Sequence, residues 1–97
     1  MKIHLKFYGV FRTAANRVEV ALEVSDRAPT VRSAISQLVA MKEFESLRSL
    51  LLEPDTSDPR PNSLIMISGR EINTLKGLDT ELSENDELAL LPVAHGG

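Results

Sequence analysis

The sequence predicts an α+β fold in which one long helix crosses a mixed sheet of four to five strands and a short second helix packs beside it. Two observations support this fold class. Apolar and polar residues alternate in two short stretches near the N-terminus, whereas in the middle of the chain the apolar residues recur at helical spacing. The chain has 97 residues, of which 42% are hydrophobic, and we therefore expect residues 1–97 to form a single domain with one core.

The first two strands are predicted near the N-terminus. In residues 2–7 the apolar side chains of Ile3, Leu5 and Phe7 alternate with polar ones, which places them on one face of a strand. A second alternating run follows, and its apolar positions are Val18, Val20, Leu22 and Val24. Residues 9–17 lie between the two runs and are interpreted as a connection, so the two strands are expected to pair as a hairpin.

Two helices are predicted in the middle of the chain. Pro29 and Thr30 are typical of a helix start, because the threonine hydroxyl accepts a hydrogen bond from a free amide of the first turn. The apolar residues of the long helix are Val31, Ile35, Leu38 and Val39. Those of the second, short helix are Phe44, Leu47, Leu50 and Leu51. We expect both apolar stripes to face the core.

Residues 53–63 are predicted to be a surface loop, since they contain three prolines and no apolar side chain outside those rings. The remaining predicted elements are strands at residues 64–67, 71–72 and 87–91, and turns at residues 77–80 and 83–86. The resulting order of strands and helices is consistent with a ubiquitin-like β-grasp domain.

The last predicted strand is apolar on both faces. Its apolar residues occupy the consecutive positions 88–91, so two of them point to each side of the sheet, although the long helix needs to cover only one side. We therefore predict an exposed apolar patch of Tyr8, Leu91 and Pro92 that binds a partner protein. The alternative is that a loop or the second helix covers the second face.

The sequence ends in Gly96-Gly97, at the end of an expected flexible C-terminal tail of residues 93–97. Glycine has no Cβ, so two in succession can pass through a channel too narrow for a side chain. At roughly 3.4 Å per extended residue the tail would reach about 17 Å, far enough to enter a buried site of a partner. We interpret the Gly97 carboxylate as the reactive group, and a frayed chain end is the alternative.

Composition argues against several other functions. The net charge of −3 and the small aromatic content, three Phe and one Tyr, are unlike those of a nucleic-acid-binding protein. No apolar run is long enough to span a membrane and no signal peptide is recognisable, so we expect a cytoplasmic protein. The chain has no cysteine, and His4 and His95 lie far apart in the sequence, so neither a thiol nucleophile nor a metal site is expected.

Several motifs along the chain are characteristic of one family. They are Lys6-Phe7-Tyr8-Gly9 followed by Arg12, Ile67-Ser68-Gly69-Arg70-Glu71, Gly77-Leu78-Asp79-Thr80 with Leu82, Asn85-Asp86-Glu87-Leu88, and Leu91-Pro92-Val93-Ala94-His95-Gly96-Gly97. With these motifs the chain resembles the small subunit of molybdopterin synthase and its ubiquitin-like sulfur-carrier relatives, including the archaeal ubiquitin-like modifiers. The most specific part of the resemblance is the C-terminal motif.

The resemblance implies a carrier whose Gly97 is adenylated by an E1-like enzyme, which uses ATP and magnesium, and is then converted to a thiocarboxylate. The thiocarboxylate would donate sulfur in molybdopterin (molybdenum cofactor) biosynthesis, with the large subunit of molybdopterin synthase as the catalytic partner. The chain itself would bind no cofactor and contain no self-contained active site. The residues implied to contact partners are Ala94, His95 and Gly96 in a channel for the tail, and Tyr8, Arg12, Leu91 and Pro92 at an interface.

Other functions remain open beside this one. The first alternative is a ubiquitin-like modifier joined through Gly97 to lysines of target proteins, and the second is a sulfur donor for tRNA thiolation or thiamine. A third alternative is a β-grasp binding module with an inert tail. The family pattern has a small residue where this chain has His95, and the larger ring would limit which enzymes accept the tail.

Acidic residues before the tail offer a further hypothesis about partners. They are Asp79, Glu81, Glu84, Asp86 and Glu87. Such a group either steers the domain toward a basic surface of its activating enzyme or belongs to ordinary solvated turns.

Overall fold

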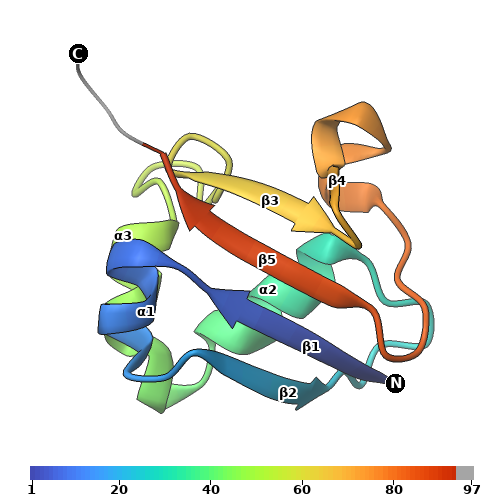
Figure 1. Cartoon of the computed structure of the whole chain (residues 1–97), viewed down its shortest axis with the longest axis horizontal. Helices are drawn as coiled ribbons and strands as arrows, with labels where there is room; N and C mark the ends of the chain where they lie inside the picture. Colours follow the sequence, from blue (N-terminus) through green and yellow to red (C-terminus); the bar gives the residue numbers. More distant parts are fainter. Residues whose placement is uncertain (94–97) are drawn as a thin grey trace.

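Five strands form one mixed sheet in the order β2-β1-β5-β3-β4 (Figure 1). Their bounds are β1 Lys2–Phe7, β2 Glu19–Glu23, β3 Ser63–Ile67, β4 Arg70–Glu71 and β5 Glu87–Pro92. β1 and β5 are parallel, whereas the other neighbouring strands are antiparallel, so the predicted mixed sheet is confirmed. This computed structural model describes residues 1–93, and the predictions for residues 94–97 lie outside the described part of the chain.

The two central strands build the inner face of the sheet. Ile3, Leu5 and Phe7 of β1 are at most 1% exposed, and Leu88 and Leu90 of β5 are fully buried. In the parallel register Leu5 lies opposite Leu88 and Phe7 lies opposite Leu90, so the inward side chains of the two strands are neighbours. The predicted first and last strands are confirmed, and their inward residues form the centre of the hydrophobic core.

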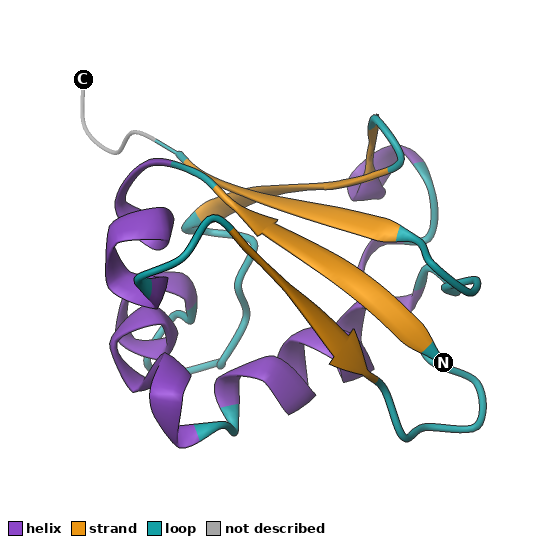
Figure 2. Cartoon of the chain, turned by 60° about the horizontal axis from the view of Figure 1, so that its bottom comes forward, coloured by secondary structure: helices purple, strands orange, loops and turns teal. Residues whose placement is uncertain are grey.

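The helices lie against the inner face and at one end of the sheet (Figure 2). α2 (Val31–Val39) crosses the sheet, while α1 (Gly9–Ala15) packs against α3 (Glu45–Leu51) near the end of β1. Three short 3₁₀ helices are η1 Lys42–Phe44, η2 Ile72–Thr74 and η3 Gly77–Asp79. Both predicted helices are confirmed as α2 and α3. None of the helices in residues 1–93 has the length and apolar character needed to cross a lipid bilayer.

α2 begins where the sequence predicts. The Thr30 hydroxyl accepts a hydrogen bond from the Ser33 amide at 3.2 Å, and the Ser33 hydroxyl accepts one from the Thr30 amide at 2.8 Å. This reciprocal pair is a capping box, which satisfies two amides that the helix itself leaves without acceptors. The Val31 amide also donates to the Thr80 carbonyl, so the start of α2 is tied to the turn that follows η3.

The prediction that residues 9–17 are a simple connection is wrong, because most of them form α1. Phe11 and Ala15 are four positions apart, which places them on one side of a helix, and they are 1% and 2% exposed. The helix ends at Asn16, whose left-handed backbone (φ 57°) is one that asparagine tolerates well. β1 and β2 pair antiparallel as expected, but α1 takes the place of a tight hairpin turn.

Three smaller predictions differ from the structure. Val18 is 57% exposed, because β2 begins only after it. Leu50 is 45% exposed, because the short helix α3 turns only one side, with Leu47 and Leu51, toward the core. The brief fourth strand is β4, one residue earlier than the predicted residues 71–72.

Removal of the capping box should cost stability. Thr30→Ala deletes the hydroxyl that accepts the Ser33 amide, and we expect the free energy of unfolding to fall by about 1 kcal/mol. Urea unfolding followed by circular dichroism measures this change. Ser46→Ala, at an exposed position inside α3, is the control and should change stability by less than about 0.5 kcal/mol. Equal losses in the two variants would contradict a specific role for the cap.

Candidate functional site

The face of the sheet opposite α2 carries an apolar surface. In the β3–β5 ladder Leu64 lies opposite Leu91 and Met66 lies opposite Ala89, and all four residues are half-buried. They alternate with the buried residues of the same strands and therefore point to the outer face. No helix in residues 1–93 lies across that face (Figure 2). We call these four residues, together with Tyr8, the outer patch.

Tyr8 completes the outer patch at the end of β1. It is 41% exposed, and it lines a hollow of about 310 Å³ that Leu91 also lines. The other lining residues are Met66, Ser68, Gly69, Glu87 and Ala89. The Tyr8 amide donates to the Leu90 carbonyl at 3.2 Å, which continues the pairing of β1 with β5 and holds Tyr8 beside the last strand. The structure thus brings together two of the residues that the sequence predicted for a partner interface.

Pro92, the third residue of the predicted patch, lies at the end of the sheet and packs against Gly9. A Cβ on Gly9 would lie 3.0 Å from Cγ of Pro92, and Gly9 has a left-handed backbone with φ +53°. Both facts favour glycine at this position, because any side chain would meet the proline ring and strain the backbone. The Val93 amide, next along the chain, donates to the Asn62 carbonyl at 3.2 Å. The base of the C-terminal tail is therefore held by contacts on both sides.

Arg12 does not belong to the same hollow. It is exposed on α1, and its place among the predicted interface residues remains a prediction. The patch predicted from the sequence did not include Leu64 and Met66. The signal was present, since residues 64–67 are consecutively apolar just as residues 88–91 are. A strand that is apolar on both faces indicates that something covers its outer face as well, and this applies to residues 64–67 as it does to residues 88–91.

Ala94, His95, Gly96 and Gly97 lie outside the described residues, so their predicted roles remain predictions. Within residues 1–93 no group of three or more His, Cys, Asp and Glu side chains is arranged to hold a metal ion.

The loop at residues 53–63, next to the base of the tail, is held by its own hydrogen bonds. One carboxylate oxygen of Glu53 accepts bonds from the Asp55 amide, the Thr56 amide and the Thr56 hydroxyl at 2.8–2.9 Å. These bonds, those from Thr56 above all, stabilise the charged form and hold the pKa of Glu53 below its ordinary value of 4.5. The Arg60 guanidinium bonds to both carboxylate oxygens of Asp58 and lowers the pKa of that group as well.

The predicted surface loop at residues 53–63 has two buried positions. The Pro59 ring is buried, and Ser63, which begins β3, is only 5% exposed. The Ser63 hydroxyl donates to the Pro59 carbonyl at 2.6 Å, so its burial leaves no polar group without a partner.

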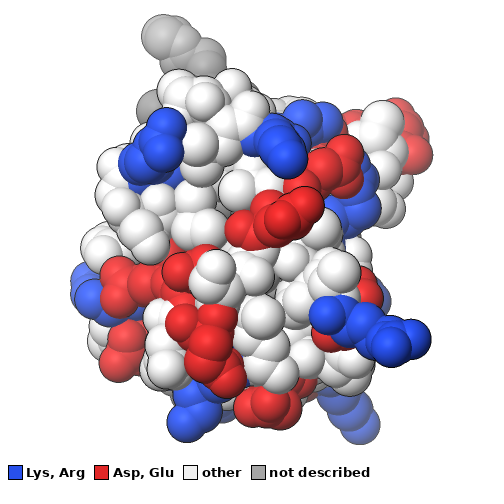
Figure 3. Space-filling view, turned by 90° about the vertical axis from the view of Figure 1, so that its right-hand side faces the viewer, with Lys and Arg blue, Asp and Glu red and all other residues white. Residues whose placement is uncertain are grey.

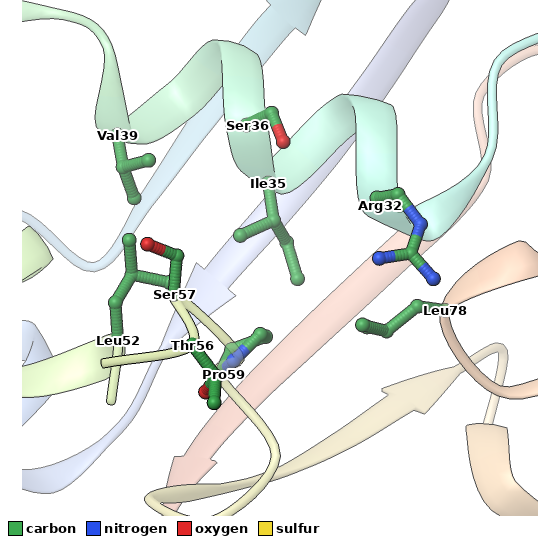
Figure 4. A pocket seen from close by; sticks show the side chains of 9 residues that line it. All are labelled: Arg32, Ile35, Ser36, Val39, Leu52, Thr56, Ser57, Pro59 and Leu78. Atoms are coloured by element: carbon green, nitrogen blue, oxygen red, sulfur yellow. The ribbon is translucent and has the colours of Figure 1, made fainter. Parts of the chain in front are cut away.

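A second hollow, of about 380 Å³, lies between α2 and this loop (Figure 4). The side chains of Arg32, Ile35, Ser36 and Val39 line it from α2. The remaining lining residues are Leu52, Thr56, Ser57, Pro59 and Leu78. Its apolar lining is mostly occupied in core packing, since Ile35, Val39 and Leu78 are each less than a tenth exposed. The outer patch lies beside the base of the tail, so it is the stronger candidate site.

The acidic residues before the tail do not form one uniform patch. Asp79 is 3.3 Å from Arg32 and Glu87 is 3.5 Å from Lys6, so two of the five carboxylates have basic neighbours. Glu84 accepts a hydrogen bond from the Lys2 amide of β1, and Asp86 accepts one from the Ser83 amide of its own turn. Figure 3 likewise shows acidic side chains in separate groups with basic side chains between them. The arrangement favours local turn stabilisation over long-range steering.

Both the sequence and the fold of this chain are similar to those of known proteins. A sequence model of the ThiS family matches residues 5–97. Small archaeal modifier protein 3 of Haloferax volcanii is 30% identical over 97 residues, which cover the full length of both chains. The solution structure of small archaeal modifier protein 1 from Methanosarcina acetivorans has a TM-score of 0.81 and 26% identity, covering 99% of this chain and 96% of that one.

A structure of lower identity shows the same fold. The putative molybdopterin converting factor, subunit 1, from Pyrococcus furiosus has a TM-score of 0.74 and 22% identity, covering 97% of this chain and 99% of that one. The expected ubiquitin-like β-grasp fold is confirmed by these matches.

The hydrogen bonds of Glu53 make the loop sensitive to acid. Because the pKa of Glu53 is lower in the folded chain than its ordinary value of 4.5, its stabilising effect is complete above pH 4.5 and is lost as the pH falls through the lowered value. We expect the NMR shifts of the Asp55 and Thr56 amides to titrate with a midpoint below pH 4.5.

Glu53→Gln should abolish this titration at both amides, whereas Glu45→Gln, at an exposed position of α3, should leave it unchanged. A midpoint above pH 4.5, or the same titration in Glu53→Gln, would show that another group controls these amides.

Proposed function

The chain belongs to the ThiS family of ubiquitin-like sulfur carriers and modifiers, and on this premise we propose that it is a sulfur carrier whose Gly97 carboxylate is converted to a thiocarboxylate. The pathway that we propose for this sulfur is molybdopterin biosynthesis, with the chain acting as the non-catalytic small subunit of molybdopterin synthase. The observation that carries the proposal is an uncovered apolar face, the outer patch, beside the base of a tail that ends in Gly96-Gly97.

The chemistry begins with activation of a poor electrophile. An oxygen of the Gly97 carboxylate attacks the α-phosphorus of ATP in an E1-like enzyme, magnesium assists, and pyrophosphate leaves. The product is an acyl-adenylate. A sulfide equivalent then attacks the carbonyl carbon and AMP leaves, which gives the thiocarboxylate. This chain supplies the carboxylate and a surface for docking, while the partner supplies the acids, bases and metal ion.

The outer patch fits the docking role for physical reasons. Tyr8, Leu64, Met66, Ala89 and Leu91 expose apolar atoms on a face that no helix in residues 1–93 covers. Removal of such apolar atoms from water favours the formation of a complex. Because Leu91 is only two residues before Val93, a partner bound at the outer patch lies beside the point where the tail begins. Docking and delivery of the carboxylate are therefore coupled.

A second candidate function is conjugation to other proteins. The 30% identity to small archaeal modifier protein 3 over the full length of both chains favours it. In this reaction the ε-amine of a target lysine attacks the activated carbonyl carbon of Gly97 and displaces the leaving group, so that an isopeptide bond forms. Activation of Gly97 is shared by the two functions, and they differ only in the nucleophile that follows.

The first prediction from this proposal concerns Gly97. Intact mass spectrometry of the protein from its own host should detect a species heavier by the difference between one sulfur and one oxygen, with the change located at Gly97. Deletion of Gly97 should remove this species and abolish adenylation, measured as pyrophosphate release, while the melting temperature stays within about 1 °C. Lysine adducts ending in Gly97 without any thiocarboxylate would favour the modifier function, and neither product would refute both.

The second prediction concerns the outer patch. Leu91→Ala removes apolar atoms from the centre of the patch and should weaken binding to the cognate E1-like enzyme by about tenfold, equivalent to ~1.4 kcal/mol. Isothermal titration calorimetry measures the affinity. Leu50→Ala, which truncates an equally apolar but 45% exposed side chain on α3, is the matched control and should bind as the unaltered chain does. Equal losses in both variants would argue against docking at the outer patch.

A further inference from the structure

We propose that Asn62 is a positioning residue that sets the direction in which the C-terminal tail leaves the sheet. The effect of Asn62 on the activation of Gly97 rests on the proposed function. Its contacts with Leu51, Pro59 and Val93 lie within the described residues. No sequence pattern pointed to Asn62, which lies in the predicted surface loop at residues 53–63.

The first observation is the bond at the base of the tail. Ser63 and Pro92 form the last pair of the β3–β5 ladder. Pro92 has no N–H, so the next donor along the chain is the Val93 amide, and it donates to the Asn62 carbonyl at 3.2 Å. This bond extends the ladder by one step beyond the last paired residues. The orientation of Val93 therefore depends on where the Asn62 carbonyl points.

The second observation is that Asn62 is itself held on its other side. Its side-chain amide donates to the Leu51 carbonyl at 3.3 Å, and its backbone amide donates to the Pro59 carbonyl at 3.2 Å. Leu51 is the last residue of α3, whose terminal carbonyls lack partners within the helix. Asn62 thus satisfies a helix end with its side chain and holds the tail with its backbone.

The surrounding turn gives Asn62 little freedom. Pro59 and Pro61 each have a restricted φ. The Ser63 hydroxyl donates to the Pro59 carbonyl at 2.6 Å, and both groups belong to buried residues. On the opposite side of the tail, Pro92 is in contact with Gly9, whose missing side chain allows the close approach. The base of the tail is therefore preorganised before any partner binds, and this reduces the loss of conformational entropy on binding.

A small change of direction at Val93 has a large effect at the reacting carbon. Four residues follow Val93. At ~3.4 Å each they reach about 14 Å, so a tilt of about 20° at the base moves the end of the tail by about 5 Å. Misplacement of a reacting group by about 1 Å can slow an enzymatic reaction by about 100-fold. Control of the exit direction is therefore a means of controlling the fraction of docked complexes that react.

The test compares Asn62→Ala with Asn73→Ala. Asn62→Ala removes the bond to Leu51 but keeps the backbone carbonyl that accepts Val93. Asn73 is a matched control, because its side-chain amide also donates one bond within a turn, to Glu71 at 2.9 Å. Two measurements are made on each full-length variant. They are the hydrogen-exchange rate of the Val93 amide in the free protein and the kcat and KM of adenylation by the cognate E1-like enzyme.

We expect Asn62→Ala to speed exchange at Val93 by at least about threefold and to lower kcat by about tenfold with KM unchanged. KM should stay constant because the outer patch still docks. A general loss of folding would instead raise exchange throughout the core. Asn73→Ala should leave both quantities as in the unaltered chain. If Asn62→Ala does not fold, Val93→Pro removes the donor of the same bond from outside the loop and should lower kcat in the same way.

Unchanged exchange at Val93 and unchanged kcat in Asn62→Ala would overturn the inference, as would equal effects of Asn73→Ala. A rise in KM with constant kcat would also overturn it, since that pattern indicates weaker docking. The failure of the proposed function is distinct. If the unaltered chain is not adenylated, that function is refuted, while the exchange rate of Val93 in the free protein still decides whether Asn62 holds the tail.

Discussion

The parallel pairing of β1 with β5 is the contact on which the rest of the structure depends. It joins the first and last strands of the described chain, and it places Leu5 beside Leu88 and Phe7 beside Leu90 in the centre of the core. Because the two strands run in the same direction, both finish at the same end of the sheet. Tyr8 and Gly9 follow β1 there, and the tail follows β5. The direction of these two strands therefore determines which residues lie beside the base of the tail.

Within residues 1–93, helices cover this sheet on one side only. α2 lies across the inner face, and its buried residues belong to the same hydrophobic core as the inward residues of β1, β2, β3 and β5. On the outer face β3 and β5 remain apolar, with Leu64 and Met66 facing Leu91 and Ala89. A protein that worked alone would gain solubility from polar residues at these positions. Their apolar character is explained if a partner protein covers the outer face, since the apolar face of a sheet is normally packed against another layer.

The loop between α3 and β3 links these two features. Its proline content predicted a surface segment, and most of its residues are exposed. Yet Glu53, Asp58 and Ser63 hold it in one conformation by hydrogen bonds, and its Asn62 contacts the first residue beyond β5. A polar, proline-rich sequence therefore does not imply a passive connection. Fixed φ angles make such a segment suitable for holding a neighbouring chain in place.

The sequence by itself determined the elements whose signals are local. Alternation identified β1, and short runs of consecutive apolar residues identified β3 and β5. Helical spacing identified α2 and α3, and Thr30 marked the start of α2, because each pattern lies within a few consecutive residues. The two-sided apolar character of β5 also predicted the outer patch in part. The tertiary structure decided what depends on distant residues. α1 forms because Phe11 and Ala15 find a place in a core made by other segments, and Asn62 meets Val93 only through the register of β3 with β5. Periodicity records which side of an element is buried, but it holds no information about which element lies on that side.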